Sequence, residues 1–297
     1  MAAESTTQVI DGLKYNEPMS RHTTWRVGGP AEHYFVPADV DALSRYLKNL
    51  KEDEPVFWLG LGSNLLVRDG GIKGSVIATA NALKGIELIN EDTVEVGAGV
   101  PCAILARFCA RNHLVKGEFF AGIPGVVGGA LRMNAGAFGG ETWPLVESVE
   151  TVNRQGKTQW RDASEYVTSY RYVEGPAEEW FIKARFKFEK GDGVKAAADI
   201  KALLDKRSAT QPSGTANCGS VFTNPESGYA AKLIEDTGLK GYRIGGAVVS
   251  EKHANFIIND KKATASDVEQ LINYVQSQVL EKTGVVLKTE VHVVGTA

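Results

Sequence analysis

The chain has 297 residues, a length that suggests about two domains, and its 43% hydrophobic and 23% charged residues exclude a disordered or collagen-like protein. Lysine and arginine number 33 against 36 aspartates and glutamates, and the net charge of -3 leaves no electrostatic footprint for nucleic acid. No apolar run approaches the roughly 18 residues of a membrane span, and the first eight residues lack the basic and apolar regions of a signal peptide.

The cysteines indicate the redox environment. Cys102, Cys109 and Cys218 have neither the spacing of metal ligands nor the even number that disulfide pairs require. Unpaired cysteines are typical of a reducing compartment, so we expect a cytoplasmic protein without a metal site.

The first two-thirds of the chain mixes predicted helices and strands. Residues 39–51 predict a helix that Asp39 caps. Its apolar face consists of Leu43, Tyr46, Leu47 and Leu50. Pro101 opens a second helix. Strands are expected at 56–59, 76–77, 94–96 and, by their alternation, within 145–190.

The pattern changes at Gly191-Asp192-Gly193, which places a domain boundary near 190–195. A polar helix follows, with Ile200, Leu203 and Leu204 as its apolar residues. We expect α+β structure on both sides of this boundary.

The clearest helix signal spans residues 266–283. Ser266 and Glu269 match a capping box, and Gly284 ends the pattern. The apolar stripe consists of Val268, Leu271, Ile272, Val275 and Val279. Residues 285–294 then predict the final strand.

Glycine is over-represented, with 32 residues, about 11% of the chain against about 7% in average proteins. The glycines cluster in three segments, at 60–65, 122–141 and 217–225. In the first segment, Gly60 and Gly62 allow backbone N–H groups to approach an anion, but Leu65 excludes a G-x-G-x-x-G fingerprint. In the second, a backbone lying flat against a ligand explains the missing side chains. The plainer interpretation of segment 60–65 is a turn after a strand, that of 122–141 is a long flexible loop, and that of 217–225 is a turn entering a strand.

Together with other segments, these resemble the UDP-N-acetylenolpyruvylglucosamine reductase family, also called UDP-N-acetylmuramate dehydrogenase. Seven segments occur in the family's order from about residue 22 to the C-terminus. They are 22–31 (HTTWRVGGPA), 60–67, 97–99, 122–141, 169–171, 217–225 and 250–258. One such segment would be weak evidence, whereas seven in order are specific.

The resemblance implies an α+β flavoenzyme that holds FAD non-covalently. Its fold would be the FAD-binding fold of the vanillyl-alcohol-oxidase (PCMH) type in two subdomains, 20–75 and 76–190, followed by a C-terminal substrate-binding domain, 195–297. The short interval between Arg171 and Ser220 resembles the compact family type without an extra tyrosine loop. The expected FAD-binding residues are Gly60, Gly62, Ser63, Asn64, Gly122, Ile123, Pro124, Gly125, Gly128, Gly129, Asn134, Ala135 and Gly136.

The implied reaction belongs to bacterial peptidoglycan synthesis. A hydride passes from NADPH to FAD and then to the enolpyruvyl group of a UDP-sugar, so negative charge develops beside the substrate carboxylate. The resemblance makes Ser220 the proton donor, Arg171 the contact to that carboxylate, and Glu290 an active-site acid that donates a hydrogen bond when protonated. Tyr170, Asn224 and Lys252 are the expected substrate-binding residues.

Taken without the family, each catalytic candidate has a plainer interpretation. Ser220 would cap a turn, and Arg171 would stack between surface tyrosines. Glu290 would share a solvated strand face with Lys288 and His292.

Two positions depart from the family pattern. Thr223 stands where a lysine or arginine is common, and Val173 where a serine is common. The alternatives that stay open are another FAD-linked oxidoreductase of the same fold and a nucleotide-sensing protein without turnover. The sequence does not distinguish NADPH from NADH. We expect a monomer with no nucleic-acid or membrane partner.

Overall fold

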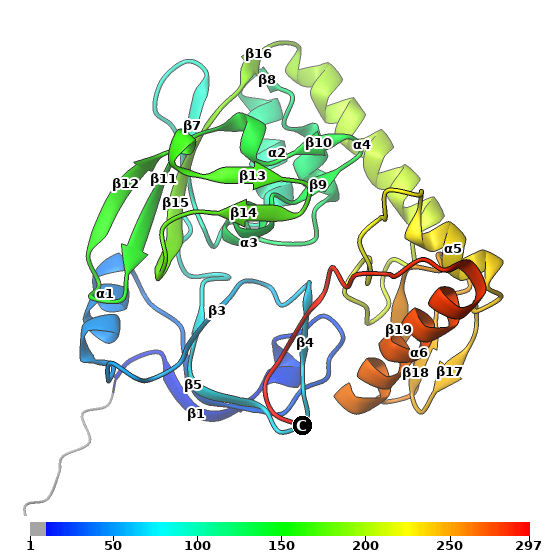
Figure 1. Cartoon of the computed structure of the whole chain (residues 1–297). Coiled ribbons are helices and arrows are strands. Elements are labelled where there is room, and N and C mark those ends of the chain that lie inside the picture. The colour runs from blue at the N-terminus through cyan, green and yellow to red at the C-terminus, as the bar shows by residue number, and fades with distance from the viewer. Residues whose placement is uncertain (1–9) are drawn as a thin grey trace, which may run out of the picture.

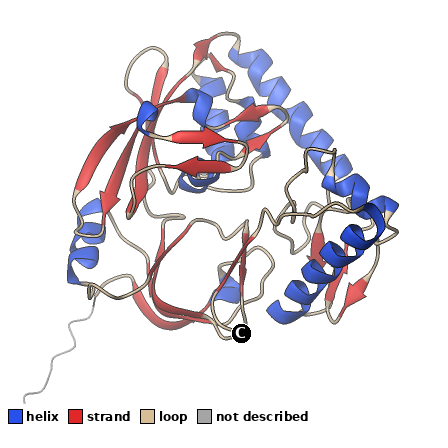
Figure 2. Cartoon of the chain, in the orientation of Figure 1, coloured by secondary structure: helices blue, strands red, loops and turns tan. Residues whose placement is uncertain are grey.

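The computed structural model describes residues 10–297, so the expectation about a signal peptide in residues 1–8 lies outside the described residues. Figure 1 shows three lobes arranged in a ring. The first lobe (residues 10–79 and 292–297) is blue and cyan with the red C-terminal end, the second (80–210) is mainly green, and the third (211–291) is yellow to red. Figure 2 shows that strands dominate the first lobe, whereas the long helices lie in the second and third.

The first lobe is built on a four-stranded sheet. Its order is β1 (Leu13–Pro18), β2 (Pro30–Phe35), β5 (Ile72–Ala78) and β3 (Val56–Leu59). Strands β1 and β2 are antiparallel, whereas β5 runs parallel to both β2 and β3. The predicted helix is α1 (Val40–Asn49): the Asp39 carboxylate accepts a hydrogen bond from the Ala42 amide at 2.7 Å, and Leu43 and Leu47 are buried. This prediction is confirmed.

The second lobe contains a five-stranded antiparallel sheet. Its order is β12 (Thr158–Asp162), β11 (Val146–Asn153), β15 (Glu179–Lys187), β7 (Thr93–Gly97) and β6 (Ile86–Leu88). The short strand pairs are β8 (Leu114–Val115) with β16 (Glu189–Lys190), β9 (Gly136–Ala137) with β10 (Gly140–Glu141), and β13 (Val167–Ser169) with β14 (Tyr172–Glu174).

Three helices complete the core of the second lobe. They are α2 (Cys102–Arg111), α3 (Val127–Met133) and α4 (Gly193–Thr210). Ala196 and Ile200 of α4 are buried in the same hydrophobic cluster as Leu105 of α2 and Leu131 of α3. The helix after the predicted boundary therefore packs on the second lobe, and the third lobe begins only where α4 ends.

The third lobe packs two helices against a small sheet. Its elements are α5 (Ala230–Asp236), β17 (Arg243–Ile244), β18 (Ala247–Val249), β19 (Ile257–Asn259) and α6 (Ala265–Thr283). The predicted apolar stripe of α6 is buried, and Gly284, at φ +72°, ends the helix, so both predictions are confirmed. No helix within residues 10–297 is long and apolar enough to cross a bilayer.

The predicted capping box of α6 is wrong by two positions. Thr264 is the N-cap and accepts a hydrogen bond from the Asp267 amide at 3.0 Å, while the Asp267 carboxylate accepts one from the Thr264 amide. Ser266 and Glu269 show a similar sequence pattern, but Glu269 accepts hydrogen bonds from Arg68 in the first lobe instead. The capping-box pattern thus occurs twice in the sequence. Because Glu269 is bound to Arg68, only Thr264 and Asp267 form the box.

The final strand is shorter than predicted. Only β20 (His292–Val294) is a strand, and it pairs in parallel with β4 (Leu65–Val67). The preceding residues bond to the third lobe, because Thr223 donates to the Lys288 carbonyl and Glu290 donates to the Val221 carbonyl. The segment changes partners as it crosses between lobes, so it forms no continuous strand.

The division at 20–75, 76–190 and 195–297 stays a prediction. Strand β1 begins before residue 20 and β20 lies near the C-terminus, yet both complete the first lobe.

Buried contacts hold the third lobe against the first. Trp25 is fully buried and donates through its indole nitrogen to the Ile257 carbonyl at 2.7 Å, and Asn259 donates to the Trp25 carbonyl at 2.9 Å. Asp69 accepts hydrogen bonds from the amides of Ala265 and Ser266 at 3.0 and 2.9 Å. The first lobe thus supplies a cap for the N-terminus of α6.

Replacing Asp69 tests this interlobe cap. We expect Asp69→Ala to lower the free energy of unfolding by about 1 kcal/mol, because two helix amides lose their acceptor. Urea unfolding measures this loss. Asp69→Asn is the matched control, since it keeps an acceptor oxygen and should lose less. Equal stability of the alanine variant and the wild type would show that the cap contributes nothing.

Candidate functional site

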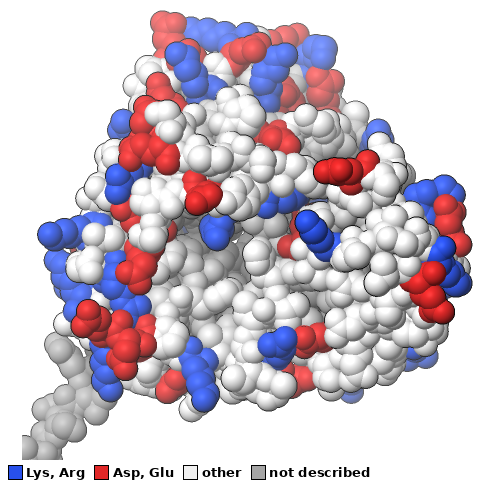
Figure 3. All heavy atoms as spheres, in the orientation of Figure 1, with Lys and Arg blue, Asp and Glu red and all other residues white. Residues whose placement is uncertain are grey.

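A cavity of about 1080 Å³ lies where the three lobes meet. Figure 3 shows this face hollowed near its centre, with mostly uncharged side chains around the hollow and a few basic and acidic ones near its rim. The lining segments include 56–65, 122–126, 128–130, 132–133, 135–138, 171–181, 218–220 and residues Glu290 and His292. Pockets for one drug-sized ligand measure roughly 300–1,000 Å³, so this cavity has room for more than one bound group.

The first glycine segment forms one wall through a close backbone approach. Gly62 has φ +62°, and a Cβ there would lie 2.1 Å from the His22 carbonyl oxygen. The Asn64 side chain donates to the Glu290 carbonyl at 2.9 Å, which ties this wall to the C-terminal segment. The segment is therefore more than a strand-ending turn, because the neighbouring main chain at His22 leaves no room for a side chain at Gly62.

The second glycine segment is not a flexible loop, because α3 lies within it and its Val127, Ala130 and Leu131 are buried. A Cβ at Gly128 would lie 3.0 Å from Ala98, whereas a Cβ at Gly129 would have no neighbour within 4 Å. Gly129 lines the cavity, so bare main chain faces the space in which a ligand would lie. The pattern fits a flat cofactor that needs uncovered backbone.

Arg171 enters the cavity from the tight turn between β13 and β14. It adopts φ +57°, and its guanidinium lies 4.9 Å from the centre of the Tyr170 ring. Its Nε donates to Glu290 at 2.9 Å, and its Nη2 donates to the Gly136 carbonyl at 3.1 Å. The guanidinium therefore stacks on Tyr170 but not between two tyrosines, and it is also bound to the candidate acid, 119 residues away in sequence.

Glu290 lies in a poorly solvated part of the cavity. Burial raises the pKa of Glu290, and the nearby Arg171 guanidinium opposes that rise. The solvated-face interpretation therefore fails for Glu290. His292 and Lys288 are both exposed, but only His292 lines the cavity.

Ser220 lies in the third lobe at the same cavity. It follows Gly219, which has φ +82°, and no hydrogen bond between its hydroxyl and another residue of the 10–297 range is present. The negative charge of Glu290 contributes to the raised pKa of Cys218, two residues before Ser220, although burial is the larger cause. Serine, guanidinium and carboxylate therefore converge on one space from three segments.

The remaining predicted residues lie around this space. Of the thirteen predicted FAD-binding residues, only Asn134 does not line the cavity, and it donates to the Ser169 carbonyl beneath the Arg171 turn at 3.1 Å. Tyr170 and Lys252 do not line it either, and the Lys252 ammonium donates to the Ser208 carbonyl. Asn224 lines an adjoining cavity of about 390 Å³ that shares Ser220.

The two positions that depart from the family pattern make main-chain hydrogen bonds. Thr223 donates through its amide to the Lys288 carbonyl at 3.0 Å and does not line the main cavity. The Val173 carbonyl accepts a hydrogen bond from Arg132 at 3.1 Å.

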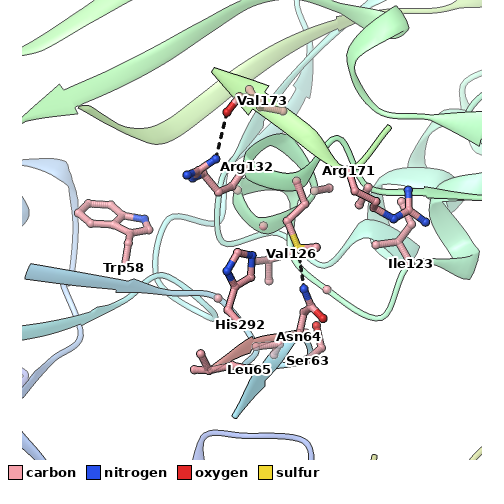
Figure 4. A pocket seen from close by; sticks show the side chains of 18 of the residues that line it. Trp58, Ser63, Asn64, Leu65, Ile123, Val126, Arg132, Arg171, Val173 and His292 are labelled. Carbon is pink, nitrogen blue, oxygen red and sulfur yellow. Dashed lines mark hydrogen bonds between the residues drawn. The ribbon is translucent and has the colours of Figure 1, made fainter. Parts of the chain in front are cut away.

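Among the cavity residues that sequence reasoning did not assign to the site are Trp58, Arg132, Trp180 and His292. Trp58 and Trp180 stack with ring centres 5.2 Å apart. Arg132 carried a usable signal, since it is the one basic residue of the glycine-rich segment 122–141. His292 carried another, since it stands two residues after Glu290. Figure 4 shows Arg132 and His292 between Trp58 on one side and Arg171 on the other.

The buried carboxyl makes a pH-dependent prediction. Because the pKa of Glu290 is raised above its ordinary 4.5, the folded protein holds this proton more tightly than the unfolded chain. As pH rises from about 4.5 through the native pKa, the wild type loses stability that Glu290→Gln does not lose. Urea unfolding at several pH values should show the wild-type free energy falling relative to the variant over this range. A difference independent of pH would contradict the burial of this carboxyl.

Comparison with known proteins identifies the family. A family model described as the C-terminal domain of UDP-N-acetylenolpyruvoylglucosamine reductase matches residues 211–294, and one described as an FAD binding domain matches residues 31–161. The reductase of that name from Methylococcus capsulatus is 56% identical over 282 residues, covering 95% of this chain and 93% of its own length. The one from Legionella pneumophila (strain Paris) is 52% identical over 298 residues, covering 100% and 98%.

A solved structure agrees. The crystal structure of UDP-N-acetylenolpyruvylglucosamine reductase from Thermus caldophilus is 32% identical, has a TM-score of 0.78, and covers 93% of this chain and 97% of its own. The predicted fold class is confirmed, with an FAD-binding fold followed by a C-terminal α+β domain. The chain belongs to the UDP-N-acetylenolpyruvoylglucosamine reductase family.

Proposed function

We propose that this chain reduces the enolpyruvyl group of UDP-N-acetylglucosamine enolpyruvate to give UDP-N-acetylmuramate, with NADPH as reductant and FAD as non-covalent cofactor. The observation that carries the proposal is the Arg171–Glu290 pair, which shares one cavity with Ser220 and with two bare glycine segments. Family membership over nearly the whole chain supports the same reaction.

The cavity walls fit FAD. Gly129 leaves main chain uncovered at the cavity, Gly60 and Gly62 line it where packing leaves no room for a side chain, and residues 31–161 match an FAD-binding domain. When bound, FAD supplies the hydride chemistry that links a nicotinamide to the substrate double bond. The chain's own residues must orient the substrate, balance its charge and supply a proton.

Arg171 is suited to the substrate carboxylate. Three of its five N–H groups are used by Glu290, Gly136 and Asn134, so two remain for a ligand. The contacts on three sides fix the plane of the guanidinium before substrate arrives. A preorganised fork of this kind stabilises charge that develops on a carboxylate.

Glu290 is suited to a protonated role beside that charge. Its Oε1 accepts from Arg171, and burial raises its pKa, which favours the protonated form that can donate a hydrogen bond. Ser220 would then deliver the proton to the substrate carbon. A serine hydroxyl is a weak acid, but a carbanion-like centre is basic enough to take its proton.

Substrate binding would extend into the third lobe. Asn224 lines the cavity that adjoins the main one at Ser220, which places it beyond the reacting end of the substrate. We propose that Asn224, together with Tyr170 and Lys252, contacts the UDP-sugar.

The cellular setting is part of the proposal. All three cysteines are buried and unpaired, which agrees with a reducing cytoplasm. The described chain lines the cavity with its own segments, so a monomer suffices for catalysis. The product serves peptidoglycan synthesis, and through it cell shape and division.

FAD retention tests the proposal most directly. We expect purified protein to be yellow and to release FAD on heat denaturation, because the cavity walls hold the cofactor without a covalent bond. Absorption spectra and identification of the released flavin measure this. A colourless protein that cannot be reconstituted with FAD would sink the proposed activity.

A half-reaction experiment tests Ser220. We expect Ser220→Ala to keep flavin reduction by NADPH nearly intact and to abolish transfer to the enolpyruvyl substrate, since only the second step needs a proton on carbon. Stopped-flow absorbance follows each half-reaction separately. Equal loss of both would remove Ser220 from the role of proton donor.

A further inference from the structure

Basic side chains are few in the main cavity, and they differ in their partners. Those that line it are Arg132, Arg171, Arg207 and His292. Arg171 pairs with Glu290, and Arg207 donates to the Gln211 side chain at 3.0 Å. Within residues 10–297, neither Arg132 nor His292 takes part in an ion pair. These two side chains are therefore the ones that the proposed catalytic groups leave unexplained.

The guanidinium of Arg132 carries a permanent positive charge and has a hydrogen-bond partner on one side only. It extends from the C-terminal turn of α3, and its Nη1 donates to the Val173 carbonyl at 3.1 Å. The neighbouring Glu174 accepts a hydrogen bond from Tyr172 and forms no ion pair with Arg132. The side chain is exposed although it lines the cavity, so its free N–H groups are available to an occupant.

His292 lies beside the first glycine segment. Its amide donates to the Asn64 carbonyl at 3.2 Å, and β20 pairs it with Leu65. Burial lowers the pKa of His292, and the Arg132 charge lowers it further. Near neutral pH the ring is therefore a neutral imidazole with one N–H donor. Four glutamates also line the cavity (Glu174, Glu178, Glu179 and Glu290), but within residues 10–297 none of them pairs with Arg132 or His292, so both donors remain available to an anionic occupant.

The position of the two residues selects which anion. The substrate end of the cavity is marked by Ser220, Arg171 and Glu290, and the adjoining cavity leads from Ser220 farther into the third lobe. In Figure 4, Arg132 and His292 lie between Arg171, which belongs to this end, and Trp58. A dinucleotide whose reactive ring lies at the substrate end would place its diphosphate in this middle region.

We propose that Arg132 and His292 together hold the diphosphate of FAD, the guanidinium as its counter-ion and the imidazole as a second hydrogen-bond donor. This inference rests on the proposed function, because it assigns residues to the cofactor of that reaction. The bond to Val173 orients the guanidinium in advance, and the pairing of β20 with β4 fixes the imidazole beside the glycine segment. Neither residue is required to touch the reacting atoms.

Titration of apoprotein with FAD tests the assignment without any measurement of turnover. We expect Arg132→Met to weaken FAD binding about tenfold or more, a change equivalent to about 1.4 kcal/mol. The loss should shrink at high salt, which screens the charge in the wild type. The ³¹P resonances of bound FAD should also shift in the variant, while the flavin absorption spectrum stays unchanged.

Matched variants separate this role from general damage. Arg107→Met removes an exposed arginine of α2 outside the cavity and should bind FAD as the wild type does. His292→Gln keeps a donor and should bind FAD more tightly than His292→Phe. Thermal unfolding of each apoprotein checks that the fold persists.

Three results would overturn the assignment. Unchanged FAD affinity in Arg132→Met, with a raised KM for NADPH or for the UDP-sugar, would give the arginine to a substrate instead. A changed flavin spectrum with unmoved ³¹P resonances would place it at the isoalloxazine ring. If the wild-type protein binds no FAD, the proposed function fails as well. If the wild type binds FAD tightly and Arg132→Met binds it equally tightly, only this inference fails.

Discussion

The site depends on a few main-chain contacts of the C-terminal segment. Glu290 donates through its amide to the Val221 carbonyl at 2.8 Å, next to Ser220, and its own carbonyl accepts from the Asn64 side chain at 2.9 Å. Two residues later, the His292 amide donates to the Asn64 carbonyl. One short stretch thus joins the serine loop of the third lobe to the glycine segment of the first. These contacts therefore hold together cavity-lining groups that come from different lobes.

Desolvation then determines how these groups behave. The same poorly solvated cavity raises the pKa of Glu290 and lowers that of His292, so both groups shift toward their neutral forms. Arg171 and Arg132 keep their charge because a guanidinium does not lose its proton in proteins. The cavity therefore presents permanent positive charge and neutral hydrogen-bond donors, a combination suited to anionic ligands whose charge increases during reaction. Interactions of this kind are stronger where water is excluded.

Local patterns predicted much of the fold, and their errors have physical causes. The stripe of α6 and the cap of α1 depend on residues a few positions apart, so both were predictable. The capping box was misplaced because Thr264 and Asp267 satisfy the same rule two positions earlier, and only the Arg68 contact shows what Glu269 does. The last strand was overextended because its alternation reveals neither where the chain changes partners nor between which lobes it passes.

By itself, the sequence determined the family, the helices with strong periodicity, and the places where glycine leaves backbone uncovered, because each of these is written in neighbouring residues or in ordered segments. The tertiary structure alone decided that Arg171 would bond to Glu290 across 119 positions, and that Arg132 and His292 would line the same cavity without an ion-pair partner among residues 10–297. It also distinguished Gly128, which must be small to pack on Ala98, from Gly129, which is open. Such contacts join residues that are distant along the chain, so no local spacing encodes them.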